Sequence, residues 1–456
     1  MKTFFTQNPA TEENISEYSQ MSVDEPLSIV KDVHGAQKEW ASLTVKDRIP
    51  YFKKLAQVFR EHKQELSELM TNEMGRPIAQ SYWEVDTKCA GLADFIADHA
   101  ESWLGDKELS ADGKKHYVTF QPLGTIFIIM PWNFPYWQPI KVALLPLVAG
   151  NTVVLKHASS VTGSALALEK MFELAGFPKN VFRTIVTGHD AMPEILASQY
   201  VQAGSLTGSE SAGMKFAEVA GKHIKKVVLE LGGSDPLIVL DDANIDEAAK
   251  QAVNGRMFNA GQVCTAAKRI IVSQKIADQF IEKFVEQTKK LVVGDPMNMD
   301  TTIGPLVNEK AVQEMESFVQ DAIDKGAVIA CGGKRLDQKG YYFEPTVIVQ
   351  TSKDMDVVCK EVFGPIAPII IAKDDEDAIN IANNSQYGLS SSIWSSNPER
   401  AENVAKKLET GAVFINATSK SDPRIPIGGI KRSGFGRELS EYGALEFVNI
   451  KAVNLY

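Results

Sequence analysis

The sequence has little cysteine and no long hydrophobic run. Only four cysteines, Cys89, Cys264, Cys331 and Cys359, occur among 456 residues, and none of their spacings suggests a disulfide framework or a metal site. We therefore expect reduced thiols, a cytoplasmic protein and no bound metal. Residues 1–30 contain one lysine and no signal-like apolar core, and no stretch approaches the roughly 20 apolar residues of a membrane-spanning helix.

An excess of basic charge is also missing. The formal net charge is −10, which disfavours non-specific binding to nucleic acid. The hydrophobic fraction of 44% and the charged fraction of 23% are typical of a globular protein that needs no membrane. A chain of 456 residues is too long for one compact core, so we expect two or three domains.

Short apolar runs alternate with helical segments from residue 124 onward. A helical stretch, 44–74, comes first, and Gly75 supplies its stop. Continuous apolar runs are typical of parallel strands buried on both faces, and strand–helix alternation predicts right-handed crossovers. The predicted strands are 125–130, 152–155, 181–186 and 227–229, and the predicted helices between them are 161–175 and 211–220.

A second series of the same kind follows Gly233. Its predicted strands are 237–240, 269–272, 346–349, 368–371 and 391–394, and its predicted helices are 276–291 and 375–384. The fold class is therefore α/β, with two doubly wound domains and a cleft between them. The alternating segment 117–121, which precedes Pro122, is a candidate for a strand that leaves the main sheet.

Three polar residues stand in informative contexts. Cys264 lies in Gly261-Gln262-Val263-Cys264-Thr265, Glu230 in Leu229-Glu230-Leu231-Gly232-Gly233, and Asn133 in Pro131-Trp132-Asn133-Phe134-Pro135. A thiolate can attack a carbonyl carbon, and a carboxylate whose pKa is raised by apolar neighbours can take a proton from water. Taken singly, each has a plainer interpretation: a structural cysteine, a surface glutamate at a strand end, or a turn asparagine beside prolines.

Together these motifs resemble the aldehyde dehydrogenase superfamily over nearly the whole chain. The resemblance implies that Cys264 attacks an aldehyde, that Glu230 activates water to hydrolyse the thioester, and that Asn133 helps to hold the oxyanion. It also implies a division into a cofactor-binding domain (1–103 and 123–232), a catalytic domain (233–436) and a small oligomerisation flap (104–122 and 437–456). The flap would include 117–121 and the tail 444–454, in a homodimer or homotetramer.

The first strand is not followed by a Gly-x-Gly-x-x-Gly fingerprint. Gly208 and Ser209 instead open a helix, which suits a pyrophosphate. Lys156 should reach the adenine ribose, and Ser159 stands where the family often has a glutamate that repels a 2′-phosphate. We therefore expect NADP in preference to NAD. The resemblance places further residues at the cofactor: Met130, Pro131, Trp132, Leu231, Glu361 and Phe363.

Three longer motifs, 231–236, 266–269 and 428–439, are most similar to those of the succinate-semialdehyde dehydrogenases of bacteria. Such a substrate has a distal carboxylate, which calls for a cation or a hydroxyl.

The candidate groups are Lys141, which stands where relatives often have an arginine, Ser421 and the nearby Arg424. The two cations could equally be solvated surface charges. Phe258 replaces a second arginine of the family, which weakens the case for strict specificity.

Three alternatives stay open at this point. One is a broader, NAD-preferring aldehyde dehydrogenase, and another is a CoA-acylating enzyme, in which a thiol takes the place of water. The third is a non-catalytic protein that keeps the fold. The presence of Cys264, Glu230 and Asn133 together argues against it.

Overall fold

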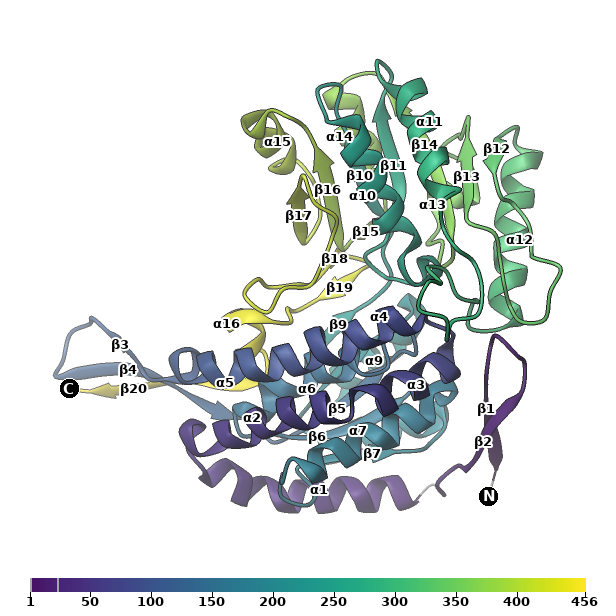
Figure 1. Ribbon diagram of the computed structural model, residues 1–456. Helices are drawn as coiled ribbons and strands as arrows, with labels where there is room; N and C mark the ends of the chain where they lie inside the picture. Colours follow the sequence, from purple (N-terminus) through teal and green to yellow (C-terminus); the bar gives the residue numbers. More distant parts are fainter. Residues whose placement is uncertain (1, 23) are drawn as a thin grey trace.

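The computed structural model describes residues 2–22 and 24–456. Figure 1 shows two α/β bodies stacked on each other and a thin arm that projects from the lower body. The lower body is built on a six-stranded sheet with the order β19-β9-β8-β5-β6-β7, in which only β19 is antiparallel. Its strands are β5 (Thr125–Met130), β6 (Thr152–His157), β7 (Phe182–Ile185), β8 (Ala203–Thr207), β9 (Lys226–Glu230) and β19 (Gly434–Phe435).

The predicted strands of this sheet are confirmed, because each apolar run is buried between helices on both faces. The helices around the sheet are α1 (Asp24–Ser42), α2 (Val45–Glu61), α3 (Lys63–Met74), α4 (Ile78–Trp83), α5 (Gly91–Leu104), α6 (Trp137–Val148), α7 (Thr162–Leu174), α8 (Met192–Ala197) and α9 (Glu210–Lys222). A π-helical segment (Glu84–Ala90) joins α4 to α5, and short 3₁₀ turns span Ser159–Val161 and His189–Ala191.

The helical stretch predicted for 44–74 is confirmed, but it is divided into two helices. Thr44 begins α2 with a capping box, and Gly75 ends α3 in the left-handed conformation (φ 80°), as the sequence predicted. Between them the chain leaves helical geometry at His62 (φ −101°, ψ 14°), so two helices form. The apolar periodicity continues across this break, and for that reason the sequence did not reveal it.

The upper body is a seven-stranded sheet with the order β12-β13-β14-β11-β10-β16-β17. All of its strands are parallel except β12. The strands are β10 (Asp235–Val239), β11 (Ala267–Ser273), β12 (Val328–Cys331), β13 (Thr346–Val349), β14 (Ile366–Ala372), β16 (Ser390–Trp394) and β17 (Ala412–Ile415). The five predicted strands are confirmed, whereas β12 and β17, at the two edges, were not predicted.

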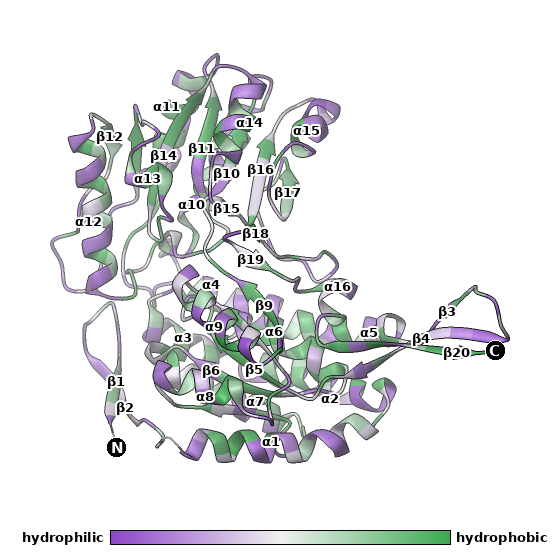
Figure 2. Cartoon of the chain, turned by 180° about the vertical axis from the view of Figure 1, so that it is seen from behind, coloured by the Kyte–Doolittle hydropathy of each residue, from purple (hydrophilic) through white to green (hydrophobic). Residues whose placement is uncertain are grey.

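Helices also cover this second sheet. They are α10 (Ile245–Met257), α11 (Ala277–Thr288), α12 (Glu309–Asp324), α13 (Asp356–Cys359), α14 (Asp375–Asn383) and α15 (Pro398–Ala405), with a 3₁₀ turn at Phe258–Gly261. A two-stranded ribbon of β15 (Tyr387–Gly388) and β18 (Ile430–Lys431) lies between the bodies, and the N-terminal hairpin pairs β1 (Thr3–Gln7) with β2 (Asn14–Ser19). Figure 2 shows that the strands of both sheets are predominantly hydrophobic.

The arm is a three-stranded antiparallel sheet with the order β20-β4-β3. It combines β3 (Lys107–Leu109), β4 (Lys115–Pro122) and β20 (Val448–Leu455), and α16 (Ser440–Ala444) precedes the last of these. The segment 117–121 therefore leaves the main sheet and pairs with the C-terminal tail. β19 pairs with β9, so the chain crosses back to the first sheet at residues 434–435, just before this arm.

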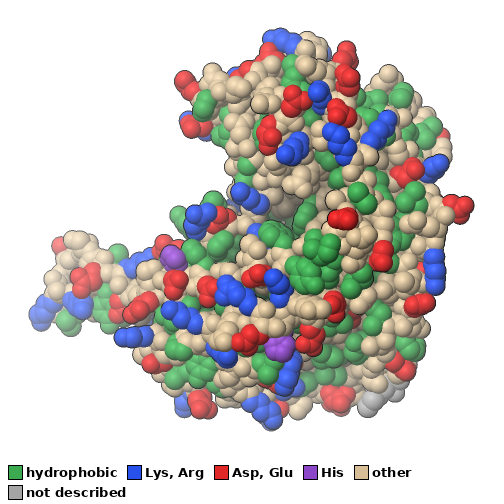
Figure 3. Space-filling view, in the orientation of Figure 1, with side chains coloured by type: hydrophobic (Ala, Val, Ile, Leu, Met, Phe, Trp, Pro, Cys, Tyr) green, Lys and Arg blue, Asp and Glu red, His purple; other side chains and the backbone are tan. Residues whose placement is uncertain are grey.

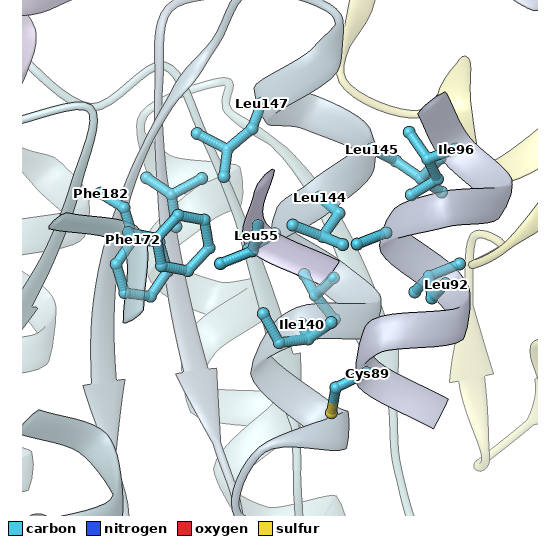
Figure 4. Close-up of a cluster of buried hydrophobic side chains, with 14 of the residues drawn as sticks. Leu55, Cys89, Leu92, Ile96, Ile140, Leu144, Leu145, Leu147, Phe172 and Phe182 are labelled. Atoms are coloured by element: carbon cyan, nitrogen blue, oxygen red, sulfur yellow. The ribbon is translucent and has the colours of Figure 1, made fainter. Parts of the chain in front are cut away.

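The largest hydrophobic core lies in the lower body. Figure 4 shows Leu55 of α2, Leu92 and Ile96 of α5, and Ile140 and Leu144 of α6 meeting in this cluster. All five side chains are at most 2% exposed, so α6 is packed tightly against α2 and α5. The N-terminus of α6 follows the loop that contains Asn133, and this packing therefore positions a predicted site residue. Among the described residues, no helix combines the length and apolar character required to span a membrane.

Candidate active site

The chain reverses its direction of winding at β5. It runs from β5 through β6 to β7 on one side, then returns to β8 and β9 on the other. Ligands of open α/β sheets bind at such a switch point, beyond the carboxyl ends of the strands. Glu230 is the last residue of β9, and Cys264 lies in the loop before β11 of the second sheet. The two predicted reactive residues therefore come from different bodies and meet where the bodies face each other.

Two cavities lie at this junction. The first, which we call the aromatic cavity, has a volume of about 250 Å³ and includes Trp83, Phe134, Trp137 and Phe258 in its wall. The second, the strand-end cavity, has a volume of about 290 Å³ and is lined mainly by residues that follow β5, β8 and β9. Their shared wall is made of Gln138, Thr207, Glu230, Leu231 and Cys264. Figure 3 shows the hollow between the two bodies.

Four polar atoms on these walls are buried and have no hydrogen-bond partner among the described residues. They are Asn133 Oδ1, Gln138 Oε1, Thr207 Oγ1 and Glu230 Oε1. Buried polar atoms are almost always paired in folded proteins, because an unpaired one costs about 1–3 kcal/mol. A polar ligand or water bound at this junction would satisfy all four of them. The sequence did not single out Gln138 or Thr207, since neither stands in a context that distinguishes it.

The thiol of Cys264 is protonated at neutral pH in the free protein. Burial raises its pKa to about 11, while the charges of Lys141 and Lys268 act in the opposite direction. The nucleophile of such a site is the thiolate, so Cys264 needs a base or a change of charge nearby before it can react. Glu230 is the carboxylate that shares both cavity walls with it.

Glu230 is 5% exposed, and its pKa is raised well above the ordinary value. Burial is the main cause, the neighbouring carboxylate of Glu438 adds to it, and Lys141 opposes it. The direction agrees with the prediction from its apolar neighbours. A carboxylate with a raised pKa holds a proton more strongly than an ordinary one, which suits it to act as a general base.

Asn133 is held from two sides. Its side-chain amide nitrogen donates to the backbone carbonyl of Gln262 (3.0 Å), and its backbone carbonyl accepts hydrogen bonds from Arg76 and from Asn259 Nδ2 (3.1 Å). An amide nitrogen has two protons, so the second remains for a ligand in the strand-end cavity, which Asn133 lines. Arg76 is completely buried and forms an ion pair with Glu84.

Glu84 completes this support. Its Oε1 accepts the backbone N–H groups of Tyr136 (2.9 Å) and Trp137 (2.8 Å), at the start of α6. A carboxylate at a helix N-terminus accepts hydrogen bonds from the free N–H groups and interacts favourably with the helix dipole. Glu84 and Arg76 together therefore fix the Pro-Trp-Asn-Phe-Pro loop. The sequence gave no signal for this pair, because its two members act on a loop some fifty residues away.

The loop that leads to Cys264 has unusual backbone geometry. Asn259 (φ 53°), Ala260 (φ 52°) and Gly261 (φ 72°) are consecutive residues in the left-handed region. A Cβ on Gly261 would overlap the carbonyl of Gly364, so glycine is required there. Left-handed conformations of other residues cost of order 1–3 kcal/mol and concentrate at functional sites.

Two buried cations hold this loop against the segment 361–364. Arg256 donates to the carbonyls of Gly261 (3.4 Å) and Val362 (3.1 Å), and Lys268 donates to those of Val263 (2.9 Å) and Cys264 (2.5 Å). Lys268 also lies 3.3 Å from Glu361 Oε1. Both residues were missed as site residues. The available signal was that Lys268 and Arg269 lie at the start of a strand whose following residues, 270–272, are apolar and buried.

The strand-end cavity brings together most of the predicted cofactor residues. Pro131, Trp132, Gly208, Ser209, Leu231, Glu361 and Phe363 all line it. Ser209 caps α9, whose N-terminus opens there, and the rings of Trp132 and Phe363 meet edge to face at 5.8 Å.

Glu361 Oε1 accepts the N–H of Gly233 (3.1 Å), and a Cβ on Gly232 would collide with the same carboxylate. The glycine pair thus admits the side chain of Glu361.

Three further cofactor candidates lie at the same sheet edge but outside this cavity wall. Met130 ends β5 and is buried. Lys156 is also buried, and burial lowers its pKa to about 8, while Asp190 opposes the shift. Its Nζ lies 3.4 Å from His189 Nδ1. Ser159 is exposed and begins the next turn, so the surface beside Lys156 has no carboxylate at this position.

The three substrate candidates differ in their positions relative to the aromatic cavity. Lys141 and Ser421 both line the aromatic cavity. Lys141 is buried and forms an ion pair with Glu438. Burial lowers the pKa of Lys141, but the charges of Glu438 and Glu230 outweigh burial and raise this pKa above its ordinary value. The expectation for Arg424 is corrected: its side chain is 72% exposed, is bound to Asp422 (2.6 Å) and is not part of the cavity wall.

Comparison with known proteins agrees with this geometry. The model of the aldehyde dehydrogenase family matches residues 2–453, so the chain belongs to that family. It is 44% identical over 451 residues, 98% of each chain, to a protein of Synechocystis sp. named probable succinate-semialdehyde dehydrogenase (NADP(+)). It is 39% identical to succinate-semialdehyde dehydrogenase (NADP(+)) of Deinococcus radiodurans, over 100% of this chain and 95% of that one.

A solved structure gives the same result for the fold. The succinic semialdehyde dehydrogenase of Streptococcus pyogenes, in complex with NADP+, superimposes with a TM-score of 0.97 at 38% identity and covers 99% of each chain. The fold class predicted from the sequence, two α/β bodies of the aldehyde dehydrogenase kind, is confirmed over the whole chain.

Proposed function

We propose that the protein oxidises succinate semialdehyde to succinate with NADP as the cofactor. The observation that carries the proposal is the shared wall, where Cys264 and Glu230 face both the aromatic cavity and the strand-end cavity. An aldehyde in the first cavity and a nicotinamide in the second would then meet at one sulfur atom. The names of the relatives support this substrate and this cofactor.

The chemistry of the chain itself follows from the groups in this wall. Glu230 takes the proton of Cys264 and releases it to solvent; the thiolate forms a bond to the aldehyde carbon, and Asn133 donates to the resulting oxyanion. Bound NADP supplies the acceptor for the hydride that leaves this carbon. Glu230 then takes a proton from water, whose oxygen attacks the thioester carbon. The carbon–sulfur bond breaks, the carboxylic acid leaves, and Cys264 regains its proton.

The cofactor part of the proposal rests on the carboxyl edge of the first sheet. Gly208 and Ser209 offer the N-terminus of α9 to a pyrophosphate, and Glu361 and Phe363 line the same cavity. A 2′-phosphate is favoured by the ammonium of Lys156 and by the neutral Ser159. Glu361 is suited to bind a ribose hydroxyl, because Gly233 donates to its Oε1 only and its Oε2 takes no part in that contact.

Initial rates test the proposal. Succinate semialdehyde and butanal, each with NADP and with NAD, should show a preference for the carboxylated aldehyde and for NADP in kcat/KM. Equal values for the two aldehydes would overturn the substrate assignment and favour a broader aldehyde dehydrogenase. Adding CoA and searching for succinyl-CoA tests the acylating alternative, which Glu230 disfavours because it can activate water.

The arm and the domain boundaries belong to the same proposal. We infer that residues 104–122 and 437–456 mediate a homodimer or homotetramer, since the arm presents β3 and β20 as two unpaired sheet edges among the described residues. Deleting residues 447–456 should then lower the oligomeric state, as measured by light scattering. The division at 232/233 and a cytoplasmic location remain predictions from the sequence.

A further inference from the structure

Lys88 lies in the wall of the aromatic cavity and has no part in the proposed chemistry so far. It belongs to the π-helical segment Glu84–Ala90, a rare geometry that is frequent at functional sites. Its Nζ lies 4.9 Å from the ring centroid of Trp83 and 5.2 Å from that of Trp137. The same nitrogen donates to the carbonyl of Ser421 at 2.5 Å. An ammonium has three donors, so this bond leaves two for a ligand.

The charge of Lys88 is not neutralised within the cavity. Among residues 2–22 and 24–456 it forms no ion pair, and Asp422, whose charge favours the ammonium, is already bound by Arg424 at 2.6 Å. Burial lowers the pKa of Lys88 to about 8, and the charges of Lys141 and Lys420 act in the same direction. A half-buried cation without an anion is costly, and a carboxylate in the cavity would offset this cost.

Three lysines line this cavity: Lys420 is exposed, whereas Lys141 and Lys88 lie deeper and have different neighbours. The charges that act on Lys141 are those of Glu438, Glu230 and Cys264. Those that act on Lys88 are, in order of size, the charges of Asp422, Lys141, Cys89 and Lys420, and Lys88 itself donates to the carbonyl of Ser421. Lys141 is therefore beside the reacting groups and already has Glu438 as a partner, whereas Lys88 is held against the loop of Ser421 and has no carboxylate partner among the described residues.

We propose that Lys88, together with the hydroxyl of Ser421, binds the distal carboxylate of the substrate and so determines the preference for aldehyde acids. The cation–π contacts with Trp83 and Trp137 hold the ammonium in place, and its bond to the Ser421 carbonyl keeps the hydroxyl beside it. Lys141 then acts on Glu230 and Cys264 and has no contact with the carboxylate. This inference rests on the proposed function, because it assumes a carboxylated aldehyde.

The test compares succinate semialdehyde with butanal, which has the same carbon chain length but no carboxylate. Lys88→Met should lower the ratio of their kcat/KM values at least tenfold, mainly through the KM of succinate semialdehyde. Lys88→Arg should restore most of the ratio, because it keeps the charge. Lys63→Met is the matched control: Lys63 also lies over an aromatic ring, that of Tyr82 (5.6 Å), but outside the cavity, and its loss should leave the ratio unchanged.

The outcomes separate the two proposals. A wild-type ratio near one would refute the substrate assignment whatever Lys88 does. A high wild-type ratio that Lys88→Met leaves intact, or equal losses on both aldehydes, would overturn the role of Lys88 and identify it as an anchor of the Ser421 loop. Melting temperature and NADP binding report whether Lys88→Met is folded; if it is not, Lys88→Gln gives the same ratio test with a side chain that still donates to Ser421.

Discussion

Replacing Asn133 with alanine should slow the first chemical turnover by about 10²–10³-fold, or about 2.7–4 kcal/mol, the usual cost of losing one oxyanion donor. The structure allows this loss to be separated from simple loosening of the loop. The Asn133 amide also donates to the carbonyl of Gln262 (3.0 Å), and an ordinary hydrogen bond contributes about 1 kcal/mol net, which accounts for only about a fivefold effect.

Asn259 provides the matched control. Its amide donates to the carbonyls of Asn133 (3.1 Å) and Gln262 (3.4 Å), but it does not line either cavity. Its φ is 53°, which glycine adopts without strain, so Asn259→Gly removes the hydrogen bonds and keeps the backbone. This variant loosens the same loop and keeps the oxyanion donor, and we expect a loss of less than about tenfold.

Rapid mixing of enzyme with aldehyde and NADP measures the relevant step as the rate at which reduced cofactor appears in the first turnover. Melting temperatures of both variants show whether they are equally folded. The reasoning fails if Asn133→Ala loses less than tenfold, or if Asn259→Gly loses as much as Asn133→Ala does. Either result would mean that Asn133 acts only as a support of the loop.

Four further predictions follow from buried groups of the site. Glu230→Gln should form about one reduced cofactor per site and then stall, because the thioester is no longer hydrolysed; burst and steady-state rates that fall together would argue against a deacylating base. Alkylation of Cys264 by iodoacetamide, followed by peptide mass spectrometry, should accelerate about tenfold per pH unit from 7 to 9, since its pKa of about 11 lies above this range; a plateau near pH 8 would contradict the burial argument. Glu84→Gln should lower the melting temperature sharply and reduce turnover, because it leaves the buried Arg76 unpaired at a cost of about 3–5 kcal/mol; an unchanged melting temperature would show the pair to be unimportant. The ratio of kcat/KM for succinate semialdehyde to that for butanal should decline above pH 8, as Lys88 loses its proton, while the contributions of the reacting groups cancel in the ratio; a constant ratio from pH 7 to 9 would contradict it.

Much of the fold could be predicted from the sequence because parallel strands buried on both faces must be continuously apolar. The run 125–130 is the clearest example, and it became β5 with the predicted bounds. The edge strands β12 and β17 were missed because an edge strand is only partly buried, so its sequence carries a weaker apolar signal. The break at His62 was missed because apolar periodicity reports burial and is insensitive to a local change of φ and ψ.

The chemistry of Cys264, Glu230 and Asn133 could be proposed from short local motifs, since each motif stays together when the chain folds. Ionic partners are different, because an ion pair depends on atoms that the fold brings together from distant segments. Lys88 and Ser421 are 333 residues apart in the chain, yet they are joined at 2.5 Å. Arg424, which was itself predicted to bind substrate and lies three residues after Ser421, instead binds Asp422 and faces solvent.

The sequence by itself thus determined the class of fold, the reactive groups and the type of reaction they allow. The tertiary structure alone decided which charges are free to meet a substrate. Burial makes an unpaired charge costly, so each cation takes the partner that lies nearest in space: Lys141 is paired with Glu438, and Lys88 is left facing the cavity.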